Sequence, residues 1–326
     1  MTTMRERPLV GLVTPSYAPA IGGVEKHVEQ LALGLARHGV PVEVITTDPT
    51  GCQPAEEWCD GVLVRRFPTL ANDGVYFVSP KLGAWLSANA GRYQLLHAHS
   101  YHTPVALLAA AAARRHRVPL AVTPHYHGTG HSLVRRLLHM PYRPVGAWLM
   151  RQAQMVVCVS QAEQRLIHHH FGPRVRTLVI PNGVDEVGAF ATGGVADAPD
   201  QATVLLSVGR LEHYKGTERL LRALPHLPLH HQAVIIGDGP ARPALERTVR
   251  ALGLGDRVRL LGRVSQADLG AWYQRADVFV TLSTREAFGI TVLEGALHGA
   301  PVLLSPIPAH MEVTEYLPHD RYVAID

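Results

Sequence analysis

The sequence predicts an α/β protein with two doubly wound parallel-sheet domains, and three observations support this fold class. Apolar segments such as residues 278–282 are uninterrupted, which is typical of parallel strands buried on both faces. They alternate with stretches of helical length and period. The alternation pauses at residues 187–201, a segment rich in Gly, Ala and polar residues that we interpret as a linker, and then restarts. We therefore expect two Rossmann-like domains, 1–182 and 183–326, that face a cleft.

The predicted elements of the first half follow in order from the N-terminus. Residues 8–14 form an apolar strand, and a Pro/Gly loop leads to an amphipathic helix over 23–38. Gly39 ends this helix and a strand at 42–46 completes a right-handed crossover unit. The other predicted elements are strands at 62–66, 95–98, 120–123, 155–159 and 178–180, and helices at 81–90, 104–114 and 161–171.

The second half repeats the alternation after the turn signal Pro181-Asn182-Gly183. Predicted strands lie at 204–208, 233–236, 257–261, 278–282 and 302–304, and predicted helices at 217–224, 240–252, 266–275 and 292–297. Such sheets bind ligands outside the carboxyl ends of their strands. The residues that follow strands are therefore the first candidates for a functional site.

Composition narrows the functional classes. The 326 residues carry a formal net charge of +4 and a pI of about 9.1, an excess that suits anionic ligands but is too small to indicate nucleic acid. Three cysteines form no disulfide framework, so we expect a reducing cytoplasm. The N-terminus has no signal-peptide pattern, and no run of about 18 apolar residues is long enough for a membrane span.

Residues 133–151 combine apolar side chains with four arginines and Trp148. One interpretation is an interfacial patch that touches the inner face of a membrane. Pro141 and Pro144 interrupt the pattern, so we favour a packed pair of helices with solvated arginines.

The stretch from Glu286 to Glu294 is the strongest candidate site. Glu286 lies on the turn after an apolar strand, and the amides of Phe288, Gly289 and Ile290 open a helix that Gly299 ends. Free N–H groups and the helix dipole make such an end an anion site.

The spacing of the two carboxylates separates this site from a glycoside hydrolase. Eight residues of helix place Glu286 and Glu294 roughly 12 Å apart, whereas paired hydrolytic carboxylates lie about 5–9.5 Å apart. The spacing favours two carboxylates that hold different parts of one long ligand. The alternative is one glutamate at the helix start and one on the surface.

Two further loops add charged or flexible groups. Arg210 and Lys215 flank a loop that opens a helix, where two cations could hold a diphosphate; a solvated loop is the alternative. Gly22 and Gly23 open the first helix and favour a backbone nest for an anion or sugar, with a plain tight turn as the alternative. Residues 237–240 lack the third glycine of a dinucleotide fingerprint, so hydride transfer is poorly supported.

Histidines also follow strands in the first half. His125 is the candidate for a ligand contact, with His127 as its rival by one step and a structural histidine as the alternative; His97 and His99 are weaker candidates. The 20 histidines show no metal-ligand spacing, and we expect the runs 168–170 and 230–231 to lie on the surface.

Together these motifs resemble retaining glycosyltransferases of family four, the glycosyl transferases group 1. The resemblance rests on the double glycine at Gly22, the Gly-Arg-Leu, three residues, Lys-Gly pattern at 209–216, and the two glutamates around Phe288-Gly289. It covers nearly the whole chain in the family's order. One departure follows the last strand, where the family usually has Gly-Gly and this chain has Pro306 to His310, with Glu312 at the family's next acidic position.

The resemblance implies the GT-B architecture and transfer of a sugar from a UDP- or GDP-linked donor to a hydroxyl of a sugar, lipid or secondary metabolite. It implies that the donor is a co-substrate, that no cofactor is bound, and that Arg210 and Lys215 neutralise the diphosphate in place of a metal. The implied contacts of the other residues are: Gly22 and Gly23 with donor phosphates or acceptor; His125 and Glu286 with the sugar; Phe288, Gly289 and Ile290 amides with sugar or phosphate; Glu294 with the ribose; Arg263 and Val264 with the base. A sugar-nucleotide epimerase of the same architecture and a non-catalytic nucleotide-sugar binder are the alternatives.

Overall fold

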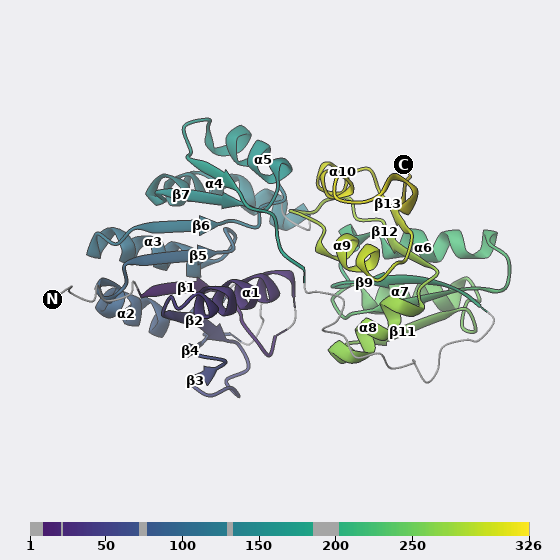
Figure 1. Cartoon of the computed structure of the whole chain (residues 1–326), viewed down its shortest axis with the longest axis horizontal. Helices are drawn as coiled ribbons and strands as arrows, with labels where there is room; N and C mark the ends of the chain where they lie inside the picture. The colour runs from purple at the N-terminus through teal and green to yellow at the C-terminus, as the bar shows by residue number, and fades with distance from the viewer. Residues whose placement is uncertain (1–8, 21, 72–76, 129–132, 185–201, 326) are drawn as a thin grey trace. The chain divides into compact units, whose positions relative to one another are not determined.

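A computed structural model of the chain describes residues 9–20, 22–71, 77–128, 133–184 and 202–325, without the side chains of 133–141. The chain divides into two compact units, Met1–Asn182 and Gly183–Asp326. Each unit contains one sheet with helices between its strands, as Figure 1 shows. The predicted fold class of two parallel-sheet α/β domains is therefore confirmed. The linker predicted at 187–201 lies outside the described residues.

The first unit has an eight-stranded sheet in the order β3-β4-β2-β1-β5-β6-β7-β8. All neighbouring strands are parallel except β3 and β4. The elements are β1 (Val10–Thr14), α1 (Gly23–Arg37), β2 (Val42–Asp48), β3 (Glu56–Cys59), β4 (Val62–Pro68), α2 (Pro80–Asn89), β5 (Leu95–His99), α3 (Pro104–His116), β6 (Leu120–Thr123), α4 (Leu133–Gln152), β7 (Met155–Cys158), α5 (Gln161–Phe171) and β8 (Thr177–Val179).

Side chains alternate between the two faces of this sheet, as the period of two requires. Leu12 of β1 and Val44 of β2 pack in one core cluster with Val28 of α1. The next residues along the strands, Val13 and Ile45, pack in a second cluster with residues of α2 and α3. Because both faces are covered, a central strand such as β1 is buried along its whole length, which explains the uninterrupted apolar runs in the sequence.

Two elements of the first unit differ from the prediction. The edge strand β3 was not predicted, because its sequence is polar and Trp58 is largely exposed, so it lacks a buried-strand pattern. Helix α4 is one continuous helix, so the predicted pair of helices is wrong. Each proline removes one backbone donor, but its φ is compatible with a helix, and 20 residues carry enough other hydrogen bonds.

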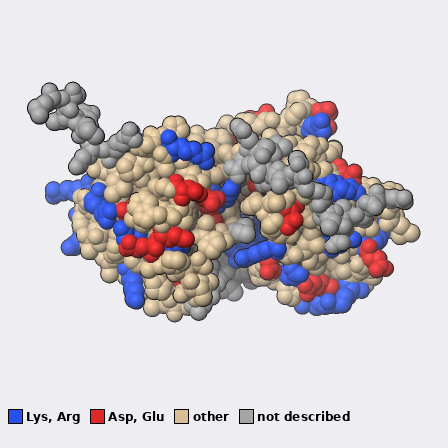
Figure 2. All heavy atoms as spheres, turned by 60° about the horizontal axis from the view of Figure 1, so that its bottom comes forward, with Lys and Arg blue, Asp and Glu red and all other residues tan. Residues whose placement is uncertain are grey.

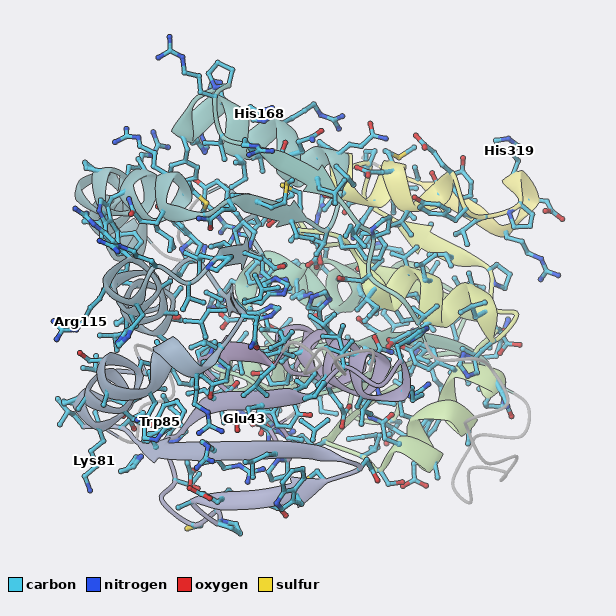
Figure 3. All side chains as sticks on the ribbon, turned by 60° about the vertical axis from the view of Figure 1, so that its left-hand side comes forward. Glu43, Lys81, Trp85, Arg115, His168 and His319 are labelled. Carbon is cyan, nitrogen blue, oxygen red and sulfur yellow. The ribbon has the colours of Figure 1, made fainter. Side chains whose placement is uncertain are left out.

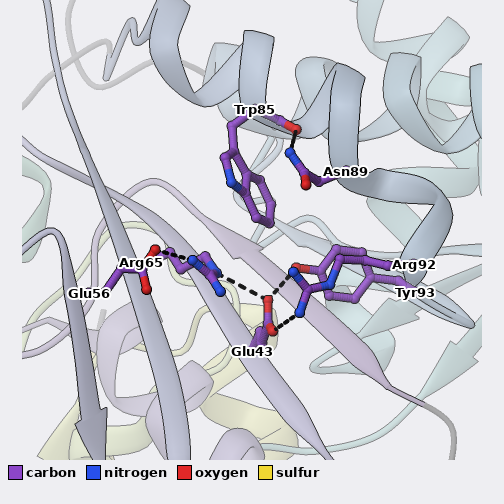
Figure 4. A network of polar contacts seen from close by, with 7 residues as sticks. All are labelled: Glu43, Glu56, Arg65, Trp85, Asn89, Arg92 and Tyr93. Atoms are coloured by element: carbon purple, nitrogen blue, oxygen red, sulfur yellow. Dashed lines mark hydrogen bonds and ion pairs between the residues drawn. The ribbon is translucent and has the colours of Figure 1, made fainter.

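The amino ends of the strands in this unit carry a buried polar network around Glu43 of β2, drawn in Figure 4. Its carboxylate accepts from Tyr93 Oη at 2.6 Å and pairs with Arg92 at 2.5 Å and Arg65 at 3.3 Å. Arg65 also lies over the Trp85 ring, and Figure 3 shows Trp85 beside Glu43. This network ties β2, β4 and α2 together at the edge opposite the carboxyl ends, so we regard it as structural.

The second unit has a six-stranded parallel sheet in the order β11-β10-β9-β12-β13-β14. Leu205, Ile235 and Val280 face one core cluster, and Phe279 packs on the other face against Tyr273. The elements are β9 (Thr203–Val208), α6 (Thr217–Ala223), β10 (His231–Ile236), α7 (Arg242–Ala251), β11 (Val258–Gly262), α8 (Gln266–Arg275), β12 (Val278–Thr281), α9 (Ile290–Leu297), β13 (Val302–Leu304), α10 (Pro308–Thr314) and β14 (Tyr322–Ala324).

Acidic and basic side chains are interspersed on the face drawn in Figure 2. This mixture agrees with the small net charge. Among the described residues, no helix is both long enough and apolar enough to cross a membrane.

Candidate functional site

The carboxyl ends of β9, β10 and β12 bring the predicted cation loop and the predicted glutamate loop together. β9 lies between β10 and β12 in the sheet. Backbone bonds join its following loop to both neighbours: Leu211 N donates to Asp238 O at 3.0 Å, and Thr284 N donates to Tyr214 O at 2.8 Å. The loop after β9 is therefore fixed by main-chain contacts on two sides.

Lys215 and Glu286 form the central contact of this site. Lys215 Nζ lies 2.6 Å from Glu286 Oε1, and Ser283 Oγ donates to the same oxygen at 2.8 Å. Burial alone would raise the pKa of Glu286, but the Lys215 charge and these hydrogen bonds hold it below its usual value. Burial would lower the pKa of Lys215, but the Glu286 carboxylate raises it. Both groups are therefore charged at neutral pH.

Gly216 explains why the lysine can approach the glutamate. Its φ is +70°, and a Cβ here would collide with the carbonyl oxygen of Leu282 at the end of β12. A larger residue would be strained and would push the two loops apart. The glycine thus brings Lys215 next to the segment that carries Glu286.

Helix α9 presents its N-terminus at the same edge of the sheet. Gly289 precedes it with φ +103°, and a Cβ there would lie 3.0 Å from the His310 ring. His310 of α10 is fully buried, with Nδ1 3.0 Å from Ser305 O. The segment where the chain departs from the family pattern therefore supplies a histidine that packs against the glutamate loop.

The second carboxylate, Glu294, is held on its helix by α8. Tyr273 Oη donates to Glu294 Oε2 at 2.7 Å, and the Tyr273 ring stacks on His298. Burial, and then the Glu294 charge, raises the pKa of Tyr273 well above its usual value, so the tyrosine stays a donor. Glu294 is thus a half-buried group whose carboxylate is oriented by a hydrogen bond, and its contact with the ribose stays a prediction.

Arg210 does not join the Lys215–Glu286 pair. Its side chain is 64% exposed and its Nε lies 3.4 Å from Glu212. Arg263 is exposed and Val264 half-buried directly after β11, the edge strand of this sheet. Of the three predicted cations, Lys215 therefore lies next to Glu286, whereas the side chains of Arg210 and Arg263 are exposed to solvent.

In the first unit, the double glycine gives a different geometry from the one predicted. Gly22 is extended, with φ −180°, and Gly23 is the first residue of α1. A Cβ on Gly22 would collide with the Glu25 carboxylate, which accepts from Ser16 Oγ. In this structure the glycine makes room for a carboxylate of its own chain rather than forming a left-handed nest. Contact of Gly22 and Gly23 with a substrate stays a prediction.

His125 lies where β5 and β6 end side by side. The hydrogen bonds between the strands continue into the loops, with Ser100 N donating to Thr123 O at 3.1 Å and Tyr101 N to Pro124 O at 2.9 Å. Ser100 and His125 both have positive φ, +66° and +50°, which is uncommon for residues with a side chain. Such strain is concentrated at functional sites.

Glu163 fixes the loop that carries His125. One of its oxygens accepts from Tyr126 N, and the other accepts from Val159 N at 2.7 Å. Burial raises the pKa of Glu163 to about 8, against the opposing effect of the two N–H donors. No signal in the sequence points to this role, because Ser160 and Glu163 have the spacing of an ordinary helix-capping pair.

His125 is one of four neighbouring histidine rings, which the sequence analysis did not connect. His125 and His99 contact His27 of α1 with ring centroids 5.0 and 5.5 Å apart, and His97 lies 4.3 Å from His99. Burial lowers the pKa of all four, so they are neutral imidazoles. His127, the rival candidate, stacks instead on His102.

The expectation of surface histidines is only partly correct. His169 is exposed, but His168 and His170 are half-buried. His170 Nδ1 lies 2.8 Å from Tyr126 Oη, and His168 Nε2 lies 3.1 Å from Thr177 Oγ1. His170 of α5 therefore helps to hold the loop that follows His125.

Comparison with known proteins agrees with these motifs. Residues 21–187 match the family model described as Glycosyltransferase Family 4, and residues 195–316 match the one described as Glycosyl transferases group 1. A glycogen synthase of Mycobacterium tuberculosis is 31% identical over 91% of this chain and 77% of its own length. A D-inositol 3-phosphate glycosyltransferase of Catenulispora acidiphila is 29% identical over 90% of this chain and 77% of its own length.

Solved structures share the fold. Sucrose-phosphate synthase of Thermosynechococcus elongatus superposes with a TM-score of 0.78 at 23% identity, covering 98% of this chain and 86% of that one. Anabaena HepE, solved with UDP-glucose, gives 0.74 at 22% identity, covering 97% and 85%. The matched family models span both units. The chain therefore belongs to the family 4 glycosyltransferases, which are group 1 glycosyl transferases with the GT-B architecture.

Proposed function

We propose that this glycosyltransferase transfers a hexosyl group, with retention at the anomeric carbon and without a metal, from a UDP- or GDP-linked donor to an acceptor hydroxyl. The observation that carries the proposal is the Lys215–Glu286 pair beside the N-terminus of α9. It combines a cation for a phosphate, a carboxylate for hydroxyls and free amides within one site.

Lys215 is the residue that binds the donor diphosphate in this proposal. Its ammonium, held by Glu286, is fully charged and sits at the ends of parallel strands, where ligands of such sheets bind. Arg210, exposed and weakly held by Glu212, reaches the same diphosphate by rearranging its side chain. Positive charge at this point stabilises the leaving phosphate as its bond to the sugar breaks.

The two carboxylates hold the two ends of the donor. Glu286 and the amides of Phe288, Gly289 and Ile290 bind hydroxyls of the sugar or phosphate oxygens. Glu294, oriented by Tyr273, accepts hydrogen bonds from two ribose hydroxyls. By resemblance to the family, Arg263 and Val264 are assigned to the base, His125 to the sugar, and Gly22 and Gly23 to the phosphates or acceptor.

The reaction that follows balances without a cofactor. The acceptor oxygen attacks the anomeric carbon from the face that the diphosphate leaves, the bond to the phosphate oxygen breaks, and this oxygen takes the acceptor proton. Lys215 and Arg210 supply the positive charge that a metal supplies in other transferases. The neighbour solved with UDP-glucose supports a uridine donor.

A donor screen followed by a product assay tests the proposal. Ligands that bind the folded chain raise its melting temperature, so the thermal shift ranks nucleotide diphosphate sugars. The best donor is then incubated with candidate acceptors in excess chelator, and the linkage of the product is read by NMR. We expect free nucleoside diphosphate and a product of unchanged anomeric configuration.

Three results would count against the proposal. A product with an inverted anomeric linkage would refute the retaining mechanism. Activity that returns only after a metal is added would refute metal-independent transfer. An intact nucleotide sugar with an altered sugar would favour the epimerase alternative, which the family matches do not favour.

A further inference from the structure

We propose that His27, His99 and His125 bind a divalent transition-metal ion such as Zn²⁺. The three residues come from α1, from the last position of β5 and from the loop after β6. One ring nitrogen from each lies within 4.8 Å of the other two. Three neutral imidazoles with an open fourth position are a donor set that Zn²⁺ accepts.

The distances require only a small adjustment. At Zn–N distances of about 2.0–2.1 Å, two nitrogens on a tetrahedral ion lie about 3.4 Å apart. Each ring therefore has to move inward by less than about 1 Å from its position here. The ring centroids lie 5.0, 5.5 and 5.9 Å apart. Because imidazole lone pairs lie in the ring planes, the nearly parallel rings of His99 and His125 also have to rotate so that each directs a nitrogen at the ion.

The hydrogen bonding of the cluster points to a ligand. Among the described residues, His27 Nε2, both nitrogens of His99 and His125 Nε2 are buried without a hydrogen-bond partner. His99 is completely buried. A buried polar group without a partner costs about 1–3 kcal/mol, and the cluster brings together three rings that carry such nitrogens.

A metal ion accounts for these nitrogens better than a sugar does. They are out of contact with solvent, so a sugar hydroxyl would reach them only after a rearrangement. The fourth histidine, His97, is excluded from the set because its Nε2 lies 2.8 Å from Thr123 Oγ1.

The site has a consequence for transfer, which rests on the proposed function. A metal bound to His125 would occupy the imidazole that contacts the donor sugar, so the ion would slow transfer rather than support it. Such an ion is distinct from the metal that other transferases place on the diphosphate.

Metal titration tests the site without an activity assay. The chain is stripped with chelator and desalted, and Zn²⁺ is titrated against a chromogenic chelator. We expect one tight equivalent, weakened at least tenfold in His27→Gln and in His99→Leu. The matched control is His169→Ala, which removes an exposed histidine of the run 168–170 and should leave the affinity unchanged.

Co²⁺ gives a second readout that does not depend on how the variants fold. We expect the intense visible bands of a four-coordinate ion, without the thiolate charge-transfer band that Cys52 or Cys59 would give. Wild-type affinity in both cluster variants, or the weak bands of a six-coordinate ion, would overturn the site. If the metal binds but transfer is unaffected by it, the site stands and the proposed role of His125 fails.

Discussion

Replacing Lys215 with Met tests the Lys215–Glu286 pair, because Met keeps most of the volume and removes the charge. Breaking a fully buried ion pair by removing one partner costs about 3–5 kcal/mol. Here the side chains are 21% and 15% exposed, and Ser283 still donates to Glu286. Solvent reduces the penalty, so we expect a loss of about 2–3 kcal/mol in the unit 183–326 at pH 7.

A double-mutant cycle separates the pair from its two members. Lys215→Met with Glu286→Gln leaves no uncompensated charge, so the double variant should lose less stability than the sum of the single variants. We expect a coupling free energy of about 1–2 kcal/mol. Sugar transfer should fall at least tenfold in Lys215→Met and should not return in the double variant, because the diphosphate still lacks its cation.

The pH dependence follows from the directions of the pKa shifts. The pKa of Glu286 is lowered from an ordinary value of 4.5. Its contribution to the free energy of unfolding is therefore present above pH 4.5 and is lost as the pH falls through the lowered pKa. The pKa of Lys215 is raised from 10.5, so its contribution is present below pH 10.5 and is lost as pH rises through the raised value. The difference in the free energy of unfolding between wild type and Lys215→Met should therefore be largest between these two pH limits and should become smaller in acid.

Hydrogen exchange measures how Lys215→Met changes the stability of residues 183–326 separately from that of the first unit. Peptides from β12 and α9 report the free energy of opening of the second sheet, while peptides from β1 and β2 serve as the internal control. Equal exchange in wild type and Lys215→Met at pH 7, or a gap that widens in acid, would refute the pairing argument. Normal transfer in a stably folded Lys215→Met would refute the diphosphate role.

Three further predictions concern other parts of the site. Glu294→Ala should weaken free nucleoside diphosphate and full donor about equally in calorimetry, whereas Glu286→Ala should weaken only the full donor. Normal binding of the free nucleotide by Glu294→Ala would show that this assignment of roles is wrong. Glu163→Gln replaces one acceptor oxygen with an NH₂ group, so either Tyr126 N or Val159 N loses its hydrogen bond. We expect the variant to be about 1–3 kcal/mol less stable in urea unfolding and to transfer sugar more slowly, because His125 is misplaced. An unchanged urea midpoint would contradict this. Transfer should persist in excess chelator, and complete loss that a divalent ion restores would show that the reaction needs a metal.

The sequence by itself determined the fold class and the order of most elements. Apolar runs and helical periods are local signals, so α5 and α8 begin and end where they were predicted. The same signals fail for β3, whose pairing with β4 leaves its side chains largely exposed. They also missed α10 and β14, which are short.

The sequence also identified the ends of strands as the places for a site, because that rule follows from the topology of any doubly wound sheet. It could not say which side chains meet there. Lys215 and Glu286 are 71 residues apart, and they touch because β9 lies next to β12 in the sheet. Arg210, predicted as an equal partner, is largely exposed and pairs with Glu212 instead.

Tertiary structure alone decided the histidine cluster and its support. His27, His99 and His125 are separated by a helix, a strand and a loop, so no ligand spacing links them in the sequence. They converge because β5 and β6 pair beyond His99 and because α1 packs over the sheet beside them. Glu163 holds the loop from a fourth element. Strand order and helix packing are long-range contacts, and local propensity carries no information about them.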